Sequence, residues 1–132
     1  MGINFPVVTM TNGLRIGNFS SPHPFTFDDG TVLPACSAER ANLSKLDTVE
    51  IEKVGPSGKW TDIEISFKLN DGIRAEIAAA QKAAEEGLVD VVLIPFPVLQ
   101  AMREAGVPVG ALRVMRNGDR VTKIVSSSRF CI

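Results

Sequence analysis

The segment Val89-Asp90-Val91-Val92-Leu93-Ile94 constrains the fold of this chain more than any other part of its sequence. Its residues are apolar except for Asp90, and most are β-branched, which favours a strand over a helix. A strand this apolar is buried on both faces, which is typical of a central strand with parallel neighbours. Parallel strands need crossover connections, most often helices. The segment therefore predicts a sheet with parallel pairs that is covered by helices.

Helical periodicity flanks this strand on both sides. Before it, Asn70 or Asp71 is placed to cap a helix that runs to about Glu86, and Gly87 supplies the stop after it. The residues expected on the core-facing stripe of this helix are Ile73, Ile77, Ala80, Ala84 and Leu88. After the strand, Pro97 suits the first position of a second helix over Val98 to Ala105.

The first half of the chain has a different pattern, in which short β-branched runs alternate with turn residues. Asn-Gly between two such runs is a strong hairpin signal, because both turn positions favour a positive φ. The expected hairpins are 7–16 around Asn12-Gly13, 25–33 around Asp28-Asp29-Gly30, and 48–69 around the turn 55–58. After the second hairpin, Ser37 is placed to cap a short helical turn.

The second strand of the third hairpin, from Trp60 to Leu69, alternates in polarity. One face carries Thr61, Ile63, Ile65, Phe67 and Leu69, and the other carries Trp60, Asp62, Glu64, Ser66 and Lys68. This period of two predicts an antiparallel strand with the first face buried and the second in water. Phe67 is accordingly expected in the core, whereas Trp60 is an interface candidate.

These patterns predict an α+β (mixed α/β) fold in one domain over residues 1–132. The length fits a single domain, since most domains have roughly 100–150 residues. N-terminal β-hairpins occupy the β-rich half 1–69, and the order β-α-β-α-β-β follows in 70–132. We expect one mixed sheet with the two helices packed on it.

The last hairpin is expected between strands 112–115 and 121–125, with a two-residue turn at Asn117-Gly118. This turn would pair Arg116 with Asp119, Met115 with Arg120, and Arg113 with Thr122. The crossovers from strand 61–69 to strand 89–94, and from there to strand 112–115, are expected to be right-handed.

Composition and chain ends exclude several classes of protein. The 14 cationic and 15 acidic side chains give a net charge of −1, which argues against a dedicated nucleic-acid binder. No apolar run approaches the roughly 20 residues of a membrane helix, and the N-terminus lacks the basic segment of a signal peptide. We therefore expect a cytoplasmic protein whose partner is neither a membrane nor a nucleic acid.

Residues that support metal or cofactor chemistry are few. One His and two Cys, at positions 36 and 131, do not suffice for a four-ligand structural zinc site without carboxylates. A disulfide between the two is disfavoured in a reducing compartment, and both thiols are expected to be buried. No Gly-rich loop follows a strand, which excludes a Rossmann or P-loop nucleotide site. The sequence thus predicts no metal and no cofactor.

The segment around the only histidine is the candidate for catalysis. His23, Asp28, Asp29 and Cys36 lie within fourteen residues, and a Cys–His pair oriented by a carboxylate is a nucleophile arrangement. The alternative is that these residues build turns, as the prolines beside His23 and the Asp-Asp-Gly sequence indicate. The other acidic pair, Glu85-Glu86, points apart by about 100° on a helix and reads as a solvated face.

The strand-to-helix corner Pro95-Phe96-Pro97 is a candidate ligand site. In open α/β sheets, ligands bind beyond the carboxyl ends of the strands. Free N–H groups at the start of the next helix would favour an anion there. The alternative is that the two prolines only set a tight turn.

Positive charge is concentrated near the C-terminus. Residues 105–132 contain five cations and a single acid, Asp119. The cations are Arg113, Arg116, Arg120, Lys123 and Arg129. A cationic face of this kind suits a phosphate, a nucleotide or an acidic partner. The alternative is a solvated hairpin whose charges offset acids elsewhere.

Several stretches resemble small uncharacterised proteins encoded in bacteriophage and prophage genomes. In the C-terminal half these are Val91 to Pro97, Asp119 to Lys123 and Arg129 to Ile132. Ser21 to Phe25, followed by Asp28-Asp29-Gly30, is similar in the same way. The resemblance covers about half of the chain in patches. It implies a phage accessory role, but no activity and no functional residues.

Three hypotheses follow. The favoured one is a non-enzymatic phage accessory binding protein that acts on a host macromolecule or on a small anionic ligand such as a nucleotide, through Phe96 and the five cations. The first alternative is a virion structural or assembly protein, such as a capsid-decorating or connector protein, since hairpins and apolar content suit a homo-oligomer. The second is a small hydrolase or transferase that uses His23 or Cys36.

Overall fold

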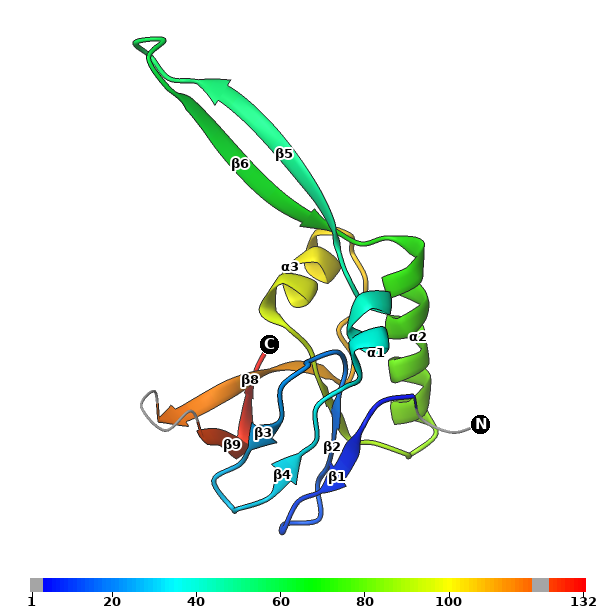
Figure 1. Cartoon of the computed structure of the whole chain (residues 1–132). Helices are drawn as coiled ribbons and strands as arrows, with labels where there is room; N and C mark the ends of the chain where they lie inside the picture. The colour runs from blue at the N-terminus through cyan, green and yellow to red at the C-terminus, as the bar shows by residue number, and fades with distance from the viewer. Residues whose placement is uncertain (1–3, 120–123) are drawn as a thin grey trace.

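The computed structural model describes residues 4–119 and 124–132, which form nine strands and three helices (Figure 1). The strands are β1 (Val7–Thr9), β2 (Arg15–Asn18), β3 (Phe25–Thr26), β4 (Val32–Leu33), β5 (Asp47–Val54), β6 (Thr61–Lys68), β7 (Val91–Leu93), β8 (Leu112–Asp119) and β9 (Ile124–Cys131). The helices are α1 (Ala38–Leu43), α2 (Asp71–Glu85) and α3 (Phe96–Glu104). The α+β fold class predicted from the sequence is confirmed.

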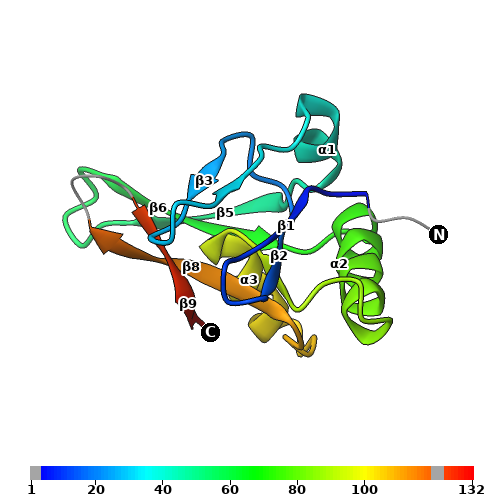
Figure 2. The same cartoon turned by 90° about the horizontal axis from the view of Figure 1, so that it is seen from below.

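The main sheet has five strands in the order β1-β2-β7-β8-β9 (Figures 1 and 2). The central strand β7 runs parallel to both neighbours, with Val92 opposite Gly17 of β2 and Leu93 opposite Arg113 of β8. The outer pairs, β1–β2 and β8–β9, are antiparallel. The predicted central parallel strand is confirmed. The strand from the first half of the chain that pairs with β7 is β2, however, and not β6. The crossover expected to join strand 61–69 to strand 89–94 within one sheet is therefore wrong.

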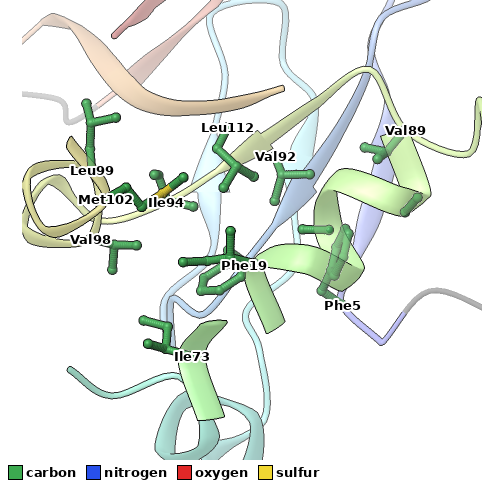
Figure 3. Close-up of a cluster of buried hydrophobic side chains, with 13 residues drawn as sticks. Phe5, Phe19, Ile73, Val89, Val92, Ile94, Val98, Leu99, Met102 and Leu112 are labelled. Carbon is green, nitrogen blue, oxygen red and sulfur yellow. The ribbon is translucent and has the colours of Figure 1, made fainter. Parts of the chain in front are cut away.

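Buried side chains cover both faces of this sheet. On one face, α2 and α3 pack over Val92 and Ile94 (Figure 3). On the other face, Leu93 packs with Ile16 and with Phe27, which lies beside the small β3–β4 sheet. Consecutive residues of this segment therefore point into opposite clusters. This is why the run around β7 is apolar at successive positions rather than at alternate ones.

The helices begin and end close to where the sequence predicts. The Oδ1 atom of Asn70 accepts a hydrogen bond from the Ile73 N–H at 2.9 Å and caps α2, and Gly87 follows this helix at φ 76°. Ser37 caps α1 through its side chain. Pro97 occupies the second position of α3 rather than the first, because the helix begins at Phe96.

The apolar stripe of α2 is confirmed in its first turns, where Ile73, Ile77 and Ala80 are buried. Ala83 is buried where Ala84 was expected to be. Leu88 lies beyond the helix and is 40% exposed, because Gly87 at φ 76° ends the helical periodicity that would have placed Leu88 on the stripe.

The first two predicted hairpins are confirmed. β1 pairs antiparallel with β2, and β3 with β4. Gly13 and Gly30 in the two connecting turns have φ values of 88° and 86°. Those values lie in the left-handed region that glycine adopts without strain.

The third hairpin forms, but it does not join the main sheet. β5 and β6 pair with each other over eight residues and extend away from the rest of the molecule (Figure 1). The face of β6 expected in the core is exposed, with Ile63 and Ile65 at 55% and Phe67 at 42%. The predicted burial of this face is therefore wrong. The reason is topological, since β2 and β8 already occupy both sides of β7.

The last hairpin has a different register from the predicted one. β8 runs through Asn117-Gly118 to Asp119, and Met115 pairs with Phe130 instead of Arg120. Arg116 and Asp119 lie on the same strand and cannot pair across a turn. The expected pairs Arg116–Asp119 and Met115–Arg120 are therefore both wrong. Register shifts flank Asn117, and such irregularities accommodate Asn and Gly inside a strand. Arg120 and Thr122 of the expected pairs, and the first three residues of the expected strand 121–125, lie outside the described residues.

Candidate interaction surfaces

The β5–β6 hairpin, residues 47–68, is called the arm below. It exposes large apolar side chains to between 42% and 71%: Val49, Ile51, Val54, Trp60, Ile63, Ile65 and Phe67. An isolated two-stranded hairpin is only marginally stable in water, and contiguous exposed apolar area marks interaction sites. The arm is therefore a candidate interaction surface.

The two faces of the arm differ in chemistry, as the strand register shows. Cross-strand partners share a face, and Glu50 lies opposite Ile65 while Glu52 lies opposite Ile63. With Phe67 beside them, these residues form what we call the acidic apolar face. The other face, called the mixed face, combines apolar residues with charges of both signs: Val49, Ile51, Lys53, Asp62, Glu64 and Lys68.

The pairing of β5 with β6 also shows that the arm is apolar on both faces, which the alternation within 60–69 alone does not show. Val54 pairs with Thr61 across the turn, which puts Ile51 on the face opposite to Ile63 and Ile65. Both faces of the hairpin are therefore partly apolar. A hairpin of this kind cannot bury all of its apolar side chains by lying on one sheet, and this could have been read from the sequence once the two strands were aligned.

The tip of the arm is ordered by Trp60. The Gly55 N–H donates to the Trp60 carbonyl at 2.8 Å, and the Gly58 N–H donates to the Gly55 carbonyl at 2.9 Å. The indole ring of Trp60 lies where a Cβ atom at Gly55 would be. Trp60 nevertheless remains 50% exposed, so its ring both closes the turn and offers contact area to a partner, as an interface candidate should.

The base of the arm is fixed to the body by Asn70. Its Nδ2 atom donates to the Lys45 carbonyl at 2.8 Å and to Oδ1 of Asp47 at 3.1 Å. Asn70 thus ties the start of β5 to the N-terminus of α2. Beside it, Nζ of Lys68 lies 3.2 Å from Oε2 of Glu104 in α3, an exposed pair that contributes little free energy.

A second surface of interest is a pocket of about 290 Å³ where β7 ends and α3 begins. It lies at the corner 95–97 that the sequence predicts as a ligand site. Its apolar lining includes Phe25, Leu93, Ile94, Phe96, Val114 and Met115. Phe96 is 54% exposed. The lining offers apolar contact and few polar groups with which to hold an anion.

The predicted cationic residues are described only in part. Nη1 of Arg113 donates to the carbonyl oxygens of Gly110 at 2.6 Å and Leu112 at 2.8 Å, which holds this side chain against the loop before β8. Arg116 and Arg129 are exposed. The structure places Phe96 in the pocket lining, whereas none of the described arginines lines that pocket. Arg120 and Lys123 lie outside the described residues.

These arginines nevertheless flank the pocket along the strands. Arg113 and Arg116 bracket Val114 and Met115, the two lining residues that β8 supplies. On β9, Arg129 precedes Phe130, which pairs with Met115. The pocket lining is therefore apolar, and the β8 and β9 residues next to it in the chain include three arginines.

Among the described residues, no hydrogen bond joins His23 to Cys36. Cys36 is buried, and its Sγ donates to the Asn18 carbonyl at 3.2 Å. Burial raises the pKa of the Cys36 thiol, which outweighs the positive charge of Arg40 nearby, so little reactive thiolate forms. The backbone of exposed His23 is bonded to the Ser21 hydroxyl. Cys131 is exposed, so the prediction that both thiols are buried is wrong for it.

The paired aspartates serve the turns, as the simpler interpretation predicts. Asp29 accepts hydrogen bonds from the Thr11 N–H at 3.0 Å and the Thr31 N–H at 2.9 Å, and these bonds hold the pKa of its carboxyl well below the usual range. Oδ1 of Asp28 accepts from the Ser127 N–H at 3.1 Å. The two carboxylates thereby connect the β3–β4 turn to the first hairpin and to β9.

Within residues 4–119 and 124–132, no three side chains of the metal-binding types gather into one group. In the same residues, no helix has the length and apolar character needed to cross a membrane. Comparisons with known proteins added no family: no family model matches the chain, and neither the curated proteins nor the solved structures contain a significant match.

Proposed function

We propose that this protein is a non-enzymatic assembly protein that joins copies of itself through the arm, in the class of phage structural proteins to which connector and capsid-decorating proteins belong. The observation that carries this proposal is the exposed, apolar, two-stranded arm (Figure 1). Covering apolar area is worth about 25 cal/mol per Å². An arm that is marginal alone therefore gains its stability from a partner.

The edges of the arm support the same role. In the part of the chain that the structure describes, β5 and β6 pair only with each other. Each strand therefore keeps one row of free N–H and C=O groups that a further strand can use. Charged residues such as Glu50 and Lys53 on β5 restrict which strands can approach. A specific partner is thus favoured over indiscriminate aggregation.

The hypothesis of a small anionic ligand receives less support. Of its predicted features, Phe96 lines the pocket, whereas none of the described arginines does. The pocket lining is apolar, so a phosphate in it would lose hydration without gaining many hydrogen bonds. An apolar surface with charge at its border is the usual composition of a protein interface.

Removing the arm tests the proposal. Val49 and Ser66 are cross-strand partners, so replacing residues 50–65 by Asn-Gly closes a shorter hairpin at the same register. We expect the wild-type chain to sediment as an oligomer and the shortened chain as a monomer. The melting temperature of the body should change little, because neither apolar core cluster contains an arm residue.

The matched control removes an exposed apolar side chain from the body instead. Val32→Ser, at a residue that is 50% exposed on β4, should leave the oligomer intact. A wild-type chain that sediments as a monomer at high micromolar concentration contradicts the proposal. So does a shortened chain that keeps the wild-type number of copies in its oligomer.

A further inference from the structure

We infer that the receptor for the arm is the pocket between β7, α3 and β8 of a second copy, into which the acidic apolar face docks. This inference rests on the proposed function and adds the partner surface to it. It is carried by a match of polarity and of charge between two surfaces of the same chain.

The donor surface combines an apolar row with an acidic row. On β6, Ile63 and Ile65 are 55% exposed and Phe67 is 42% exposed. On the same face of β5, Glu50 and Glu52 lie directly across from Ile65 and Ile63. No base contributes to these two rows. A receptor for this face therefore needs an apolar depression with positive charge along one side.

The pocket has this composition. Its lining is apolar, and Phe96 and Met115 are 54% and 38% exposed at residues that a partner can reach. Arg116 and Arg129 are both exposed, and they are the chain neighbours of Met115 in the lining and of Phe130, its partner on β9. In sequence, β8 and β9 together carry only one acid, Asp119. Opposite charges at an interface fix the register of docking and exclude wrong partners.

The other surfaces match less well. The mixed face of the arm contains both lysines and carboxylates, so it has no preference for a cationic receptor. A second pocket, of about 350 Å³ between α2 and the loop before β8, is lined by Arg74 and Glu85 among others. One charge of each sign gives it no preference for an acidic partner. The acidic apolar face and the first pocket are the complementary pair.

Charge reversal tests the pairing. The arm variant carries Glu50→Arg with Glu52→Arg, and the pocket variant carries Arg116→Glu with Arg129→Glu. Each should weaken assembly at least about tenfold, because like charges then meet across the contact. A chain that carries all four changes should assemble again, as measured by sedimentation. Since all the changed residues are exposed, folding, checked by circular dichroism, should be unaffected.

The matched control reverses two acids on the mixed face. Asp62→Arg with Glu64→Arg makes the same change in net charge on the same arm, but on the side that faces away from the receptor. Assembly of this variant should equal that of the wild type. Equal weakening by both arm variants would overturn the inference, because only the net charge of the arm would then matter.

Cross-linking gives a second readout that does not depend on charge. Cys131 is exposed and lies directly opposite Val114, a lining residue of the pocket. With an added thiol oxidant, a cysteine at position 63, 65 or 67 of one copy should form a disulfide with Cys131 of another. Ile51→Cys, on the mixed face, should not. Loss of the product in Cys131→Ser would identify the partner thiol, and absence of any product from all three positions would overturn the inference.

The outcomes separate the inference from the proposed function. A monomeric wild type overturns both. Another result is assembly that requires the arm but fails both to recover in the chain with four reversals and to cross-link to Cys131. That outcome overturns the inference alone and keeps the proposed function. Recovery together with the cross-link supports both.

Discussion

Arg40 connects three parts of the core through one guanidinium group. Its Nε donates to the Phe19 carbonyl at 3.0 Å, and its Nη1 pairs with Oε2 of Glu76 on α2. The group also lies over the rings of Phe5 and Phe19, 5.8 and 5.2 Å from their centres. Arg40 is only 7% exposed. Nothing in the sequence marks it, because its partners are distant in the chain.

We expect Arg40→Ala to lower the free energy of unfolding by about 3 kcal/mol, since it leaves the largely buried carboxylate of Glu76 without its partner. Urea unfolding measures this. Arg15→Ala is the control, because the Arg15–Asp90 pair is about 38% exposed on both sides and its loss should lower the free energy by about 1 kcal/mol or less. Equal losses in the two variants would contradict the expected role of burial.

The carboxyl of Asp29 makes stability depend on pH. Its pKa is lowered in the folded chain by hydrogen bonds from the backbone N–H groups of Thr11 and Thr31. The unfolded chain therefore binds more protons in acid, and the stabilisation is present above the unfolded pKa of about 4 and is lost as the pH falls below it. We expect Asp29→Asn to reduce the slope of unfolding free energy against pH in this acidic window. An unchanged slope would contradict the assignment. Asp90, whose pKa is lowered mainly by the hydrogen bond from the Arg15 side chain, keeps part of the slope in either case.

At the scale of elements, the arm tip can be perturbed without touching the body. A Cβ atom at Gly55 would overlap the Trp60 ring, so Gly55→Ala should displace the indole into water. Trp60 is the only tryptophan, and its fluorescence should therefore shift to longer wavelength while the melting temperature of the body stays unchanged. Gly58→Ala is the control, because a Cβ atom there meets no neighbouring atom although φ is 72°. It introduces backbone strain at the tip without displacing the ring, so its fluorescence should not shift. An unchanged spectrum in Gly55→Ala would show that the ring does not need this position.

The elements that local patterns determine were predictable. Asn70, Gly87 and the apolar run through Val92 each act on their own neighbours, and the sequence places α2 and β7 correctly from them. The position of β6 was not predictable from its own period of two. That period fixes which side chains share a face, whereas the burial of Ile63 and Ile65 depends on whether a sheet has room for them.

The candidate site was predictable in part for the same reason. The corner at Phe96 was found because strand ends next to helices are where pockets form. The positions of the arginines on β8 and β9 could not be predicted in this way. Asn117-Gly118 predicts a hairpin turn but lies inside an irregular strand. A register that includes bulges depends on the pairing of whole strands, and no dipeptide encodes it.

At the scale of the whole molecule, the arm and the pocket are different surfaces, so the inferred contact is heterologous. Repetition of such a contact generates a closed ring when the rotation between copies permits it, and an open helical filament otherwise. Reciprocal docking of two arms gives a two-fold dimer. Negative-stain electron microscopy distinguishes these three products.

The charge match predicts a salt dependence of assembly. Ions shorten the range of electrostatic interactions from about 10 Å at 0.1 M to about 3 Å at 1 M. Raising the salt concentration should therefore weaken the wild-type assembly. It should affect the variant Glu50→Gln with Glu52→Gln less, because its remaining contact is apolar. Sedimentation across a salt series measures both. Identical salt responses would contradict a role for these two glutamates.

The amide of Asn70 has a consequence for communication within the chain. One side chain both steadies the root of the arm and closes the first turn of α2. If the arm docks on a second copy as we infer, the restraint on β5 should therefore extend through Asn70 to the first turn of α2. Slower hydrogen exchange at the Ile73 amide on assembly would show that docking of the arm also stabilises the first turn of α2 in the body.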